Sequence, residues 1–512
     1  MGKEGGRLVR NPILPGMYPD PSICRVGEDY YLVTSTFEWF PGVPIFHSRD
    51  LVNWRQIGHV LDRPSQLNLD GVRSSGGIFA PTIRYHDGVF YMITTLVGGS
   101  GPSGNFLVTA TDPAGPWSDP HWLPDARGID PSLFFDDDGT AWVCGTREKE
   151  RQSYRGETEI WLRRLDLDTF QLYGEELVIW EAVQRGSVWC EAPHIYKIDG
   201  RYYLVTAEGG TSTEHSVMVA RADHVTGPYT PDPRNPILTH RHLGLDHPIS
   251  CTGHADLVQD HAGDWWMVLL AVRRYGGGEN LGRETFLTSV RWEDGWPVAS
   301  PVEPVTSAPV VPAHPWPASP ACDHFDSVRL SPVWNHLRTP RERYWSAGDG
   351  RLRLRLRPER LGEPVNPSLI ARRQQHMDFA VHTALDFQPG PGECAGLVLV
   401  RSDDNHVLLV RTEHGLELIR REAGETTRLA HAELPPGRVH LGVEAHGQAY
   451  QARYAVEPGE WRDLGGPFDG RLFGLSAAES FTGTYIGLYA SSNGRPSDNV
   501  AEFPWFEYLP LS

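Results

Sequence analysis

The sequence predicts an all-β protein in which a five-bladed β-propeller is followed by a β-sandwich. Two observations support this fold class: a structural unit recurs five times before residue 300, and apolar and polar residues alternate with a period of two after residue 320. Repeats of short strands at a regular interval are typical of propellers, and alternation is typical of strands with one buried face. Stretches with helical periodicity are almost absent.

The repeated unit contains a turn with Asp, Asn or Gly, then two large residues and a run rich in β-branched side chains. It reads Asp-Tyr-Tyr-Leu-Val-Thr at 29–34 and Gly-Arg-Tyr-Tyr-Leu-Val-Thr at 200–206. Each interval between units is long enough for four short strands and their turns, and five such units around an axis form a propeller. Aromatic anchors mark the units at steps of 60, 51, 61 and 63 residues: Tyr31, Tyr91, Trp142, Tyr203 and Trp266.

A stretch rich in Pro, Ala and Val follows the repeats. We interpret it as an extended linker over 301–320, which places the propeller at 1–300 and the second domain at 321–512. In the second domain the alternation is clearest in Arg-Leu-Arg-Leu-Arg-Leu-Arg at 351–357, and Gly-Leu-Val-Leu-Val at 396–400 follows the same pattern. Because the propeller period is absent there, we expect a sandwich whose strands each have one wet face.

Charge and aromatic content restrict the partners of the protein. The chain contains 47 Lys and Arg residues and 65 Asp and Glu residues, which gives a formal net charge of −18. Such a surface repels nucleic acid and anionic membranes, so we expect neither as a partner. The 17 Trp, 18 Tyr and 18 Phe residues offer flat faces that suit neutral sugars. The sequence leaves the oligomeric state open, a homo-oligomer included.

The cellular location is inferred from what the sequence lacks. The first residues contain no apolar core of a signal peptide, and no apolar run approaches the roughly 18 residues of a membrane span. The six cysteines are isolated, with no Cys-x-x-Cys pair, which favours reduced thiols. A cytoplasmic protein is therefore the expectation, provided that no leader has been removed.

Alignment of the repeats on their anchors brings chemically active residues into register. Asp20 lies 11 residues before its anchor, and 12 residues separate four others from theirs: Phe79, Asp130, Glu191 and His254. Equivalent positions of propeller blades converge at one end of the axis, so these side chains should surround one pocket. Taken singly, an Asp before Pro can also be a turn cap. Three carboxylates in register across the repeats favour a working site.

Paired carboxylates indicate glycoside hydrolysis. In that reaction one carboxylic acid protonates the departing oxygen, and a second, ionised carboxylate activates water on the other face of the sugar. A third carboxylate nearby raises the pKa of the acid by repulsion between like charges. Asp20, Asp130 and Glu191 supply this set.

Six short motifs stand out in the N-terminal part of the chain: Tyr-Pro-Asp-Pro-Ser at 18–22, Gly-Ile-Asp-Pro-Ser at 128–132, Glu-Ala-Pro-His at 191–194, Ala-Glu-Gly-Gly-Thr at 207–211, Gly-His-Ala-Asp-Leu at 253–257 and Leu-Gly-Arg-Glu-Thr at 281–285. These motifs resemble those of glycoside hydrolase family 43, in the branch that contains β-xylosidases and α-L-arabinofuranosidases. The resemblance covers nearly the whole chain, since the C-terminal part is similar to the concanavalin-like jelly-roll sandwich of those enzymes, notably at 370–374 and 481–487.

This resemblance implies a role for each matching residue. Asp20 would be the general base, Glu191 the general acid and Asp130 the residue that orients the acid and raises its pKa. The residues implied to contact the sugar are Phe37, Phe79, Thr211, His254, Arg283 and Phe481.

Some of these implied contacts have a structural alternative. Arg283 can instead form a surface salt bridge, Phe37 can pack between blades, and Phe481 can belong to the core of the sandwich rather than reach the pocket rim. In some relatives the place of His254 neighbours a bound calcium, so the resemblance makes His254 a candidate Ca²⁺ ligand near the axis, although no cofactor is expected to be required. Phe79 stands where many xylosidases of the family have Trp.

The predicted function is an inverting exo-acting hydrolase that releases one pentose, xylose or arabinose, from xylo- or arabino-oligosaccharides. Two alternatives remain at this stage: endo-action on arabinan or xylan, and a carbohydrate-binding propeller without catalysis. A sandwich that walls the pocket would argue against the first, and the Asp, Asp and Glu set argues against the second, because binding alone needs no acid and base. The natural oligosaccharide is not determined by the sequence.

Overall fold

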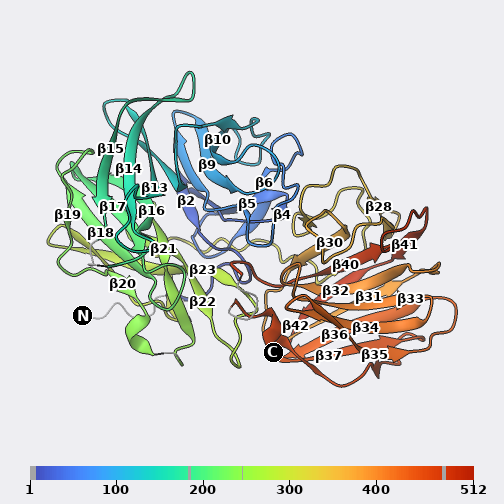
Figure 1. The fold of residues 1–512 in the computed structure, drawn as a ribbon. Helices are drawn as coiled ribbons and strands as arrows, with labels where there is room; N and C mark the ends of the chain where they lie inside the picture. The colour runs from blue at the N-terminus through green and yellow to red at the C-terminus, as the bar shows by residue number, and fades with distance from the viewer. Residues whose placement is uncertain (1–6, 183–185, 245, 476–479, 512) are drawn as a thin grey trace.

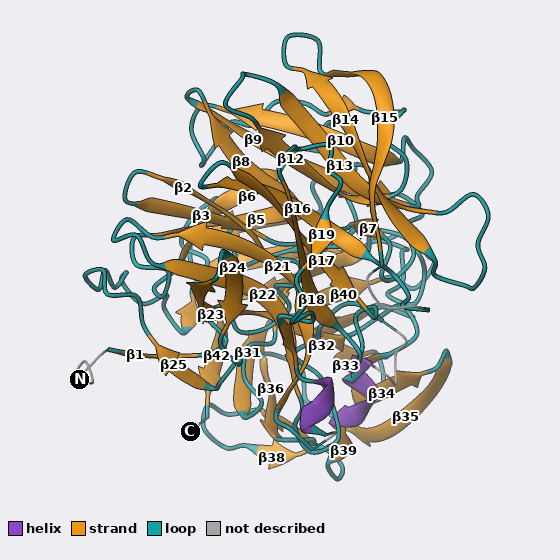
Figure 2. Cartoon of the chain, turned by 90° about the vertical axis from the view of Figure 1, so that its left-hand side faces the viewer, coloured by secondary structure: helices purple, strands orange, loops and turns teal. Residues whose placement is uncertain are grey.

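The computed structural model describes residues 7–182, 186–244, 246–475 and 480–511. Strands dominate this part of the chain, and short helical turns such as η1 (Arg241–Leu243) and η2 (Gly470–Phe473) are minor (Figure 2). The chain forms two bodies side by side, an N-terminal one in blue to green and a C-terminal one in orange to red (Figure 1). No helix among the described residues is long and apolar enough to cross a membrane.

Apart from β1 (Leu8–Arg10) and β4 (Trp39–Phe40), which pair with strands beyond residue 300, the described strands up to Ala299 form five antiparallel sheets, which are the five blades of the predicted propeller. Blade I runs in the order β2 (Ser22–Val26), β3 (Asp29–Val33), β5 (Gly42–Ser48), β6 (Arg55–Leu61). Blade II contains β7 (Gly77–Ile78), β8 (Thr82–His86), β9 (Val89–Val97), β10 (Gly104–Ala110) and β11 (His121–Trp122). Blade III runs β12 (Ile129–Phe135), β13 (Ala141–Glu148), β14 (Thr158–Asp166), β15 (Gln171–Glu181).

The last two blades repeat this plan. Blade IV contains β16 (Glu191–Ile198), β17 (Arg201–Glu208), β18 (Ser216–Ala222), β19 (Thr230–Pro231) and β20 (Leu238–Thr239). Blade V runs β21 (Ile249–Gln259), β22 (Trp265–Arg273), β23 (Arg283–Glu293), β24 (Trp296–Ala299). The anchor aromatics lie on β3, β9, β13, β17 and β22, so the sequence repeat is the blade and the predicted fold class is confirmed.

The Pro-rich stretch at 301–320 lies along the propeller. Within it β25 (Val305–Ser307) pairs with β1 (Leu8–Arg10), which ties both ends of the propeller together. Farther along, the backbone N–H of His314 donates to Asp50 at 2.8 Å, and the guanidinium of Arg55 lies 3.9 Å from the centre of the Trp316 ring. These contacts attach the stretch to blade I.

The C-terminal domain is a sandwich of two large sheets. One sheet contains β26 (Cys322–Asp323), β42 (Phe506–Pro510), β31 (Phe379–Leu385), β36 (Val439–His446), β37 (Ala449–Ala455), β38 (Arg462–Asp463) and β39 (Phe468–Asp469). The other runs β30 (Ser368–Arg373), β40 (Tyr485–Ser491), β32 (Cys394–Val400), β33 (His406–Thr412), β34 (Gly415–Glu422), β35 (Glu425–Ala432). A smaller sheet joins β28 (Trp345–Gly348), β29 (Arg351–Arg355) and β41 (Val500–Phe503).

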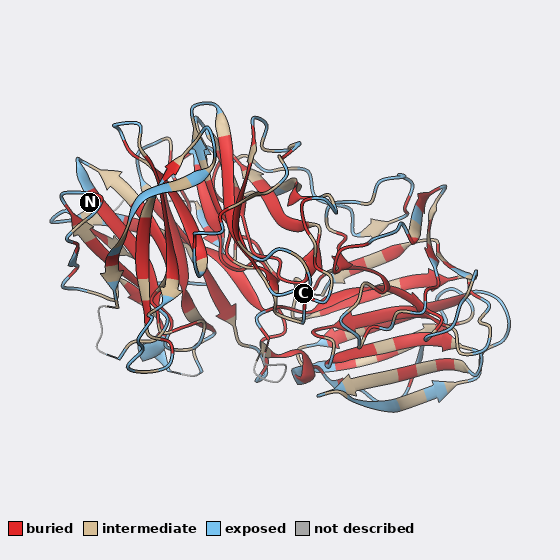
Figure 3. Ribbon diagram, turned by 45° about the horizontal axis from the view of Figure 1, so that its top comes forward, coloured by how far each residue is buried: buried red, intermediate tan, exposed pale blue. Residues whose placement is uncertain are grey.

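The two domains share a buried contact, which corrects one expectation. The alternation predicts one wet face for each strand, and β29 fits, with Leu352 and Leu354 buried between partly exposed arginines. Every residue of β32, however, is buried. The outward side chains Val398 and Val400 belong to the same apolar cluster as Trp39 of the propeller, so the face predicted to be wet packs on the other domain. Figure 3 shows that buried residues occupy much of the strands in both domains.

Two further contacts join the domains within this interface. Trp39 stacks on Tyr485 with ring centroids 3.6 Å apart, and β4 (Trp39–Phe40) pairs with β27 (His336–Leu337) across the boundary.

The cysteines do not form disulfides. All six are free, and most are buried. Burial raises the pKa of Cys24 and of Cys144 to about 12, so these thiols remain protonated and unreactive at neutral pH.

A buried ionic network connects all five inner strands near the propeller axis. Asp256 on β21 accepts hydrogen bonds from Ser22 Oγ at 2.7 Å, from Arg84 Nη1 at 2.8 Å and from the hydroxyl of Tyr196 on β16. His194 extends the network, with Nδ1 3.0 Å from Arg84 Nη2 and 2.9 Å from the hydroxyl of Ser132 on β12. Burial alone would raise the pKa of Asp256, but Arg84 and its other partners outweigh burial and lower it.

We predict that Asp256→Ala destabilises the propeller by about 3–5 kcal/mol, because it leaves the Arg84 charge buried without its partner. Urea denaturation followed by tryptophan fluorescence measures the loss. The matched control is Asp119→Ala, which removes the exposed partner of Arg63 and should change stability far less, since exposed ion pairs contribute little. Equal losses in the two variants would contradict the proposed importance of the axial network.

Candidate active site

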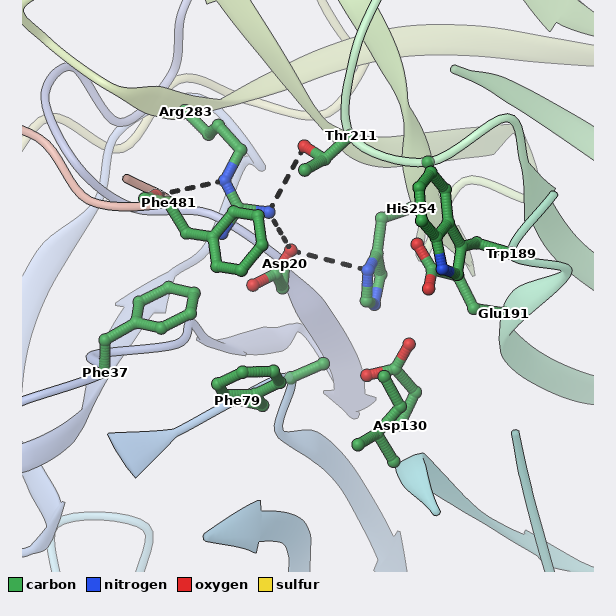
Figure 4. A pocket seen from close by; sticks show the side chains of 13 residues that line it. Asp20, Phe37, Phe79, Asp130, Trp189, Glu191, Thr211, His254, Arg283 and Phe481 are labelled. Carbon is green, nitrogen blue, oxygen red and sulfur yellow. Dashed lines mark hydrogen bonds and ion pairs between the residues drawn. The ribbon is translucent and has the colours of Figure 1, made fainter. Parts of the chain in front are cut away.

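A cavity of about 280 Å³ lies where the inner strands converge, beside the sandwich (Figure 4). Its wall contains every side chain to which the sequence assigned a site role: Asp20, Phe37, Phe79, Asp130, Glu191, Thr211, His254, Arg283 and Phe481. The wall also contains Ala80, Ile129, Trp189 and Gly210. The structure therefore brings the predicted site residues of five blades and one sandwich loop together in one place.

The backbone aims the polar side chains by a shared local distortion. Asp20, Asp130 and His254 have left-handed backbones, with φ of 54°, 53° and 47°, and so does Ala192, which follows Glu191, with φ of 54°. The register of the ladder shifts at the same points in blades III, IV and V. Such bulges re-aim a side chain at the end of a strand, and a left-handed backbone is strained in a residue other than glycine.

Asp20 is held in its ionised form. Its Oδ1 lies 3.1 Å from Arg283 Nη1 and 3.4 Å from His254 Nδ1, and its Oδ2 accepts the hydroxyl hydrogen of Ser35. Burial alone would raise the pKa of Asp20, but the Arg283 guanidinium, His254 and Ser35 outweigh burial, so the pKa of Asp20 lies below its ordinary value.

The pKa values of Glu191 and Asp130 are shifted upward, opposite to that of Asp20. Burial, with the added repulsion of Asp130 and Asp20, raises the pKa of Glu191 well above its ordinary value. Burial raises the pKa of Asp130 too, although the backbone N–H of Ala192 donates to Asp130 Oδ2 at 3.2 Å. That contact fixes Asp130 beside the strand that carries Glu191. The cavity thus contains one carboxyl whose pKa lies below its ordinary value and two whose pKa values lie above it.

Three phenylalanines form the apolar side of the cavity. The ring of Phe37 lies 5.3 Å from that of Phe79 and 6.0 Å from that of Phe481, measured between centroids. Phe37 is 2% exposed and belongs to the interdomain core, so it packs and lines the cavity at once. Phe481 is 42% exposed and lies in the cavity wall rather than in the core of the sandwich.

Arg283 is a buried cation and not a surface residue. It is 5% exposed, and its guanidinium lies 5.3 Å from the centre of the Phe37 ring and 5.4 Å from that of Phe481. Its Nε donates to the carbonyl oxygen of Phe481 at 3.2 Å, and its Nη1 is 3.4 Å from Thr211 Oγ1. Arg283 also lines the cavity, where its guanidinium can donate to sugar hydroxyls.

His254 does not belong to a metal site in this structure. Among the described residues, no group of three or more His, Cys, Asp or Glu side chains is arranged to hold an ion. The nearest carboxylate, Asp20, is already paired with Arg283. The residues present therefore do not fit a protein-ligated calcium, which prefers six to eight oxygen ligands, and we derive no step through a metal.

Trp189 has the largest side chain of the four lining residues that the sequence analysis did not identify. It is 41% exposed and has a left-handed backbone with φ of 49°. Its indole rests against Gly210 and Gly156, where an added Cβ would lie 2.5 Å and 3.1 Å from the ring. The available signal was its position two residues before Glu191, but Trp189 precedes the strand and so lies outside the register that identified the other residues.

Comparisons with known proteins agree with this geometry. Residues 9–297 match the family model described as glycosyl hydrolases family 43, and residues 322–509 match the β-xylosidase C-terminal concanavalin A-like domain. The chain is 44% identical over 518 residues to a xylosidase/arabinosidase of Butyrivibrio fibrisolvens, covering 98% of this chain and 99% of the relative. It is 40% identical over 527 residues to a non-reducing end α-L-arabinofuranosidase of Bacteroides ovatus, covering 99% and 95%.

Solved structures give the same result. The crystal structure of a xylan β-1,4-xylosidase from Bacillus halodurans superposes with a TM-score of 0.93 at 38% identity, over 98% of this chain and all of that one. Both domains and their relative placement are thus shared with a solved enzyme. The chain belongs to glycoside hydrolase family 43 and carries the concanavalin A-like C-terminal domain found in β-xylosidases of that family.

Proposed function

We propose that the protein is an inverting, exo-acting glycoside hydrolase that releases a non-reducing-end pentose from xylo- or arabino-oligosaccharides without a cofactor. The observation that carries the proposal is a pair of carboxyls in one cavity whose pKa values shift in opposite directions, downward for Asp20 and upward for Glu191. A binding protein has no need for this difference, whereas acid–base hydrolysis of a glycoside depends on it.

In the proposed mechanism Asp20 acts as the base. It accepts a proton from a water molecule, whose oxygen attacks the anomeric carbon from the side opposite the leaving group. Glu191 donates its proton to the glycosidic oxygen as the bond between that oxygen and the anomeric carbon breaks. The products are a free pentose of inverted configuration and a shortened alcohol. Asp20 then loses its proton and Glu191 regains one by exchange with solvent.

This mechanism needs space for the water between the two carboxyls. In inverting enzymes the carboxyls are about 6.5–9.5 Å apart, against about 5–5.5 Å in retaining ones. Asp20 comes from the first blade and Glu191 from the fourth, and Figure 4 shows them on different sides of the His254 ring in this view. Their origin in separate blades supports a single displacement.

Asp130 assists the acid in two ways. Its negative charge contributes to the raised pKa of Glu191, after burial itself. Its hydrogen bond with the N–H of Ala192 holds the backbone next to Glu191, which orients the acid. Asp130 is therefore proposed to modulate the acid and not to react with the sugar.

Exo-action is supported by the size of the cavity and by the contribution of the second domain to its wall. At about 280 Å³ it is smaller than most sites for drug-sized molecules, which occupy about 300–1,000 Å³. Phe481 of the sandwich domain forms part of its wall. A small pocket bounded by a second domain suits a chain end better than the middle of a long polysaccharide.

The sugar is proposed to be a pentose on the strength of the relatives. Their names include xylosidase/arabinosidase, α-L-arabinofuranosidase and β-xylosidase. Phe79, in the apolar wall, leaves more room than the Trp of many xylosidases would. Trp189, beside the acid in Figure 4, lies on the side from which the leaving group departs, where its exposed indole can stack on the next sugar.

We predict that the protein hydrolyses both aryl β-D-xylopyranoside and aryl α-L-arabinofuranoside, because both sugars present similar hydroxyls to one pocket. Release of nitrophenol measures both rates side by side. Phe79→Trp, which narrows the apolar wall, should change the ratio of the two kcat/KM values. Absence of both activities in folded protein would refute the pentosidase proposal.

We predict that Asp20→Asn and Glu191→Gln each lower kcat on oligosaccharides by at least about 10²-fold, the usual contribution of a general base or acid. The pH profile of the wild type should be bell-shaped, because Asp20 must be ionised and Glu191 protonated. Asp20→Asn should lose the acidic limb and Glu191→Gln the alkaline limb.

A change of leaving group separates the two roles. Nitrophenol departs readily without protonation, so Glu191→Gln should be less impaired on aryl glycosides than on oligosaccharides, whereas Asp20→Asn should be impaired on both. The surface variant Asp119→Asn serves as the control and should behave as the wild type. Equal impairment of Glu191→Gln on both kinds of substrate would contradict its role as the acid.

A further inference from the structure

Ser75 of the propeller contacts the loop that brings Phe481 into the cavity at two consecutive residues. Ser75, between β6 and β7, accepts the backbone N–H of Phe481 at 2.9 Å, and its hydroxyl lies 2.9 Å from the hydroxyl of Ser480. These residues are separated by 405 and 406 positions in the sequence and belong to different domains. Ser75 therefore contacts the cavity wall from behind, outside the set of lining residues.

The hydroxyls of Ser75, Ser480 and Thr482 form a hydrogen-bonded chain in which each one donates to the next. Thr482 donates its hydroxyl hydrogen to the carbonyl oxygen of Arg401 at 3.3 Å. Its oxygen can then accept from Ser480, 2.8 Å away, and the oxygen of Ser480 can accept from Ser75. Each hydroxyl has a single hydrogen to donate, so this arrangement satisfies all three. Removal of the Ser75 hydroxyl takes away the first donor of the chain and the acceptor of the Phe481 N–H together.

The backbone of Ser75 is itself constrained. Its φ is 67°, a left-handed conformation that is unusual for serine, and its N–H donates to Glu38 Oε2 at 3.0 Å. Glu38 is 1% exposed, so this acceptor is fixed in the interdomain interface. A strained residue persists where its surroundings determine its conformation, and such residues cluster at functional sites.

The position of Phe481 affects Arg283 as well as the shape of the cavity. The carbonyl oxygen of Phe481 accepts from Arg283 Nε at 3.2 Å, and the Phe481 ring lies 5.4 Å from the guanidinium. Arg283 in turn holds Asp20 at 3.1 Å. A displaced Phe481 would therefore loosen Arg283 and weaken the interaction that keeps Asp20 ionised.

We propose that Ser75 is a positioning residue, which fixes the 480–482 segment of the sandwich so that the Phe481 ring closes the sugar pocket and the Phe481 carbonyl holds Arg283 against Asp20. The inference rests on the proposed function for its kinetic consequences, but the contact itself can be tested independently. Other titratable groups face Asp20 as well: His254 on β21, His215 before β18, and the carboxyls of Asp130 and Glu191.

The test uses Ser75→Gly, because glycine adopts a φ of 67° without strain and the substitution removes only the hydroxymethyl group. Ser75→Ala is a second variant that lacks the hydroxyl but keeps a Cβ. The matched control is Ser74→Ala: the Ser74 hydroxyl also bonds across the domains, accepting the N–H of Asp403 at 3.0 Å, yet it does not touch the 480–482 segment.

Two measurements are made on the full-length protein. The first is amide hydrogen exchange of the peptide that contains Phe481, which needs no substrate and should be faster in both Ser75 variants than in the wild type and in Ser74→Ala. The second is the pH profile of kcat/KM on an aryl pentoside. Loss of one or two hydrogen bonds should lower kcat/KM about tenfold. A weaker Arg283 contact raises the pKa of Asp20, so the acidic limb should move to higher pH.

The outcomes separate this inference from the proposed function. Wild-type exchange at Phe481 in both Ser75 variants would overturn the inference, as would an unshifted acidic limb with unchanged kcat/KM. An equal limb shift in Ser74→Ala would also overturn it, because the effect would then follow any weakening of the interface. If the wild type hydrolyses no pentoside, the proposed function fails, and the exchange measurement still decides whether Ser75 holds the loop.

Discussion

The ion pair between Arg283 and Asp20 determines how the pocket can work. Three carboxyls lie in one buried cavity, where neither burial nor mutual repulsion favours ionisation. Arg283 lies next to only one of them at hydrogen-bond distance, and Asp20 is the one whose pKa falls. The same fold can therefore hold a base and an acid at the same pH. Since the Arg283 guanidinium lies 5.3 Å from the centre of the Phe37 ring and 5.4 Å from that of Phe481, its surroundings come from both domains.

The propeller supplies the geometry that this ion pair needs. The inner strands converge, and a left-handed residue at or beside each catalytic position aims its side chain at the axis. Along β21, His254 reaches the cavity, and two residues later Asp256 joins the ionic network of the inner strands. The ladder register shifts between Gly253 and Ala255, and His254 has a left-handed backbone, so the ordinary alternation of side chains is interrupted where the site begins.

Much of this structure was predictable because it is encoded locally. Each blade has its own anchor, and the distance from anchor to active residue is nearly constant, so Asp20, Asp130 and Glu191 could be assigned to one pocket from sequence alone. The same logic could not find Trp189, which lies in a loop before its strand. Nor could it find Ser75 or Ser35. The role of a serine depends on its hydrogen-bond partner, which is known only once the chain has folded.

Contacts between the domains were the main limit of the sequence analysis. The alternation in β32 indicated a strand with a wet face, because a pattern of apolar residues does not show whether a second domain covers the strand. The hydrogen bond between Ser75 and Phe481 joins residues 406 positions apart, with no local signal at either end. The contact between Arg283 and the backbone carbonyl of Phe481 cannot be predicted from residue types, because every residue has a backbone carbonyl.

The central claim is that Asp20 and Glu191 act in one step, as base and acid on opposite faces of the sugar. Proton NMR of the first-formed product tests it most directly, because the two anomers of free xylose have separate signals before they equilibrate. Hydrolysis of a β-xyloside should release α-xylose first, with the β anomer growing in only by mutarotation. Initial release of β-xylose would show retention of configuration and would contradict the account.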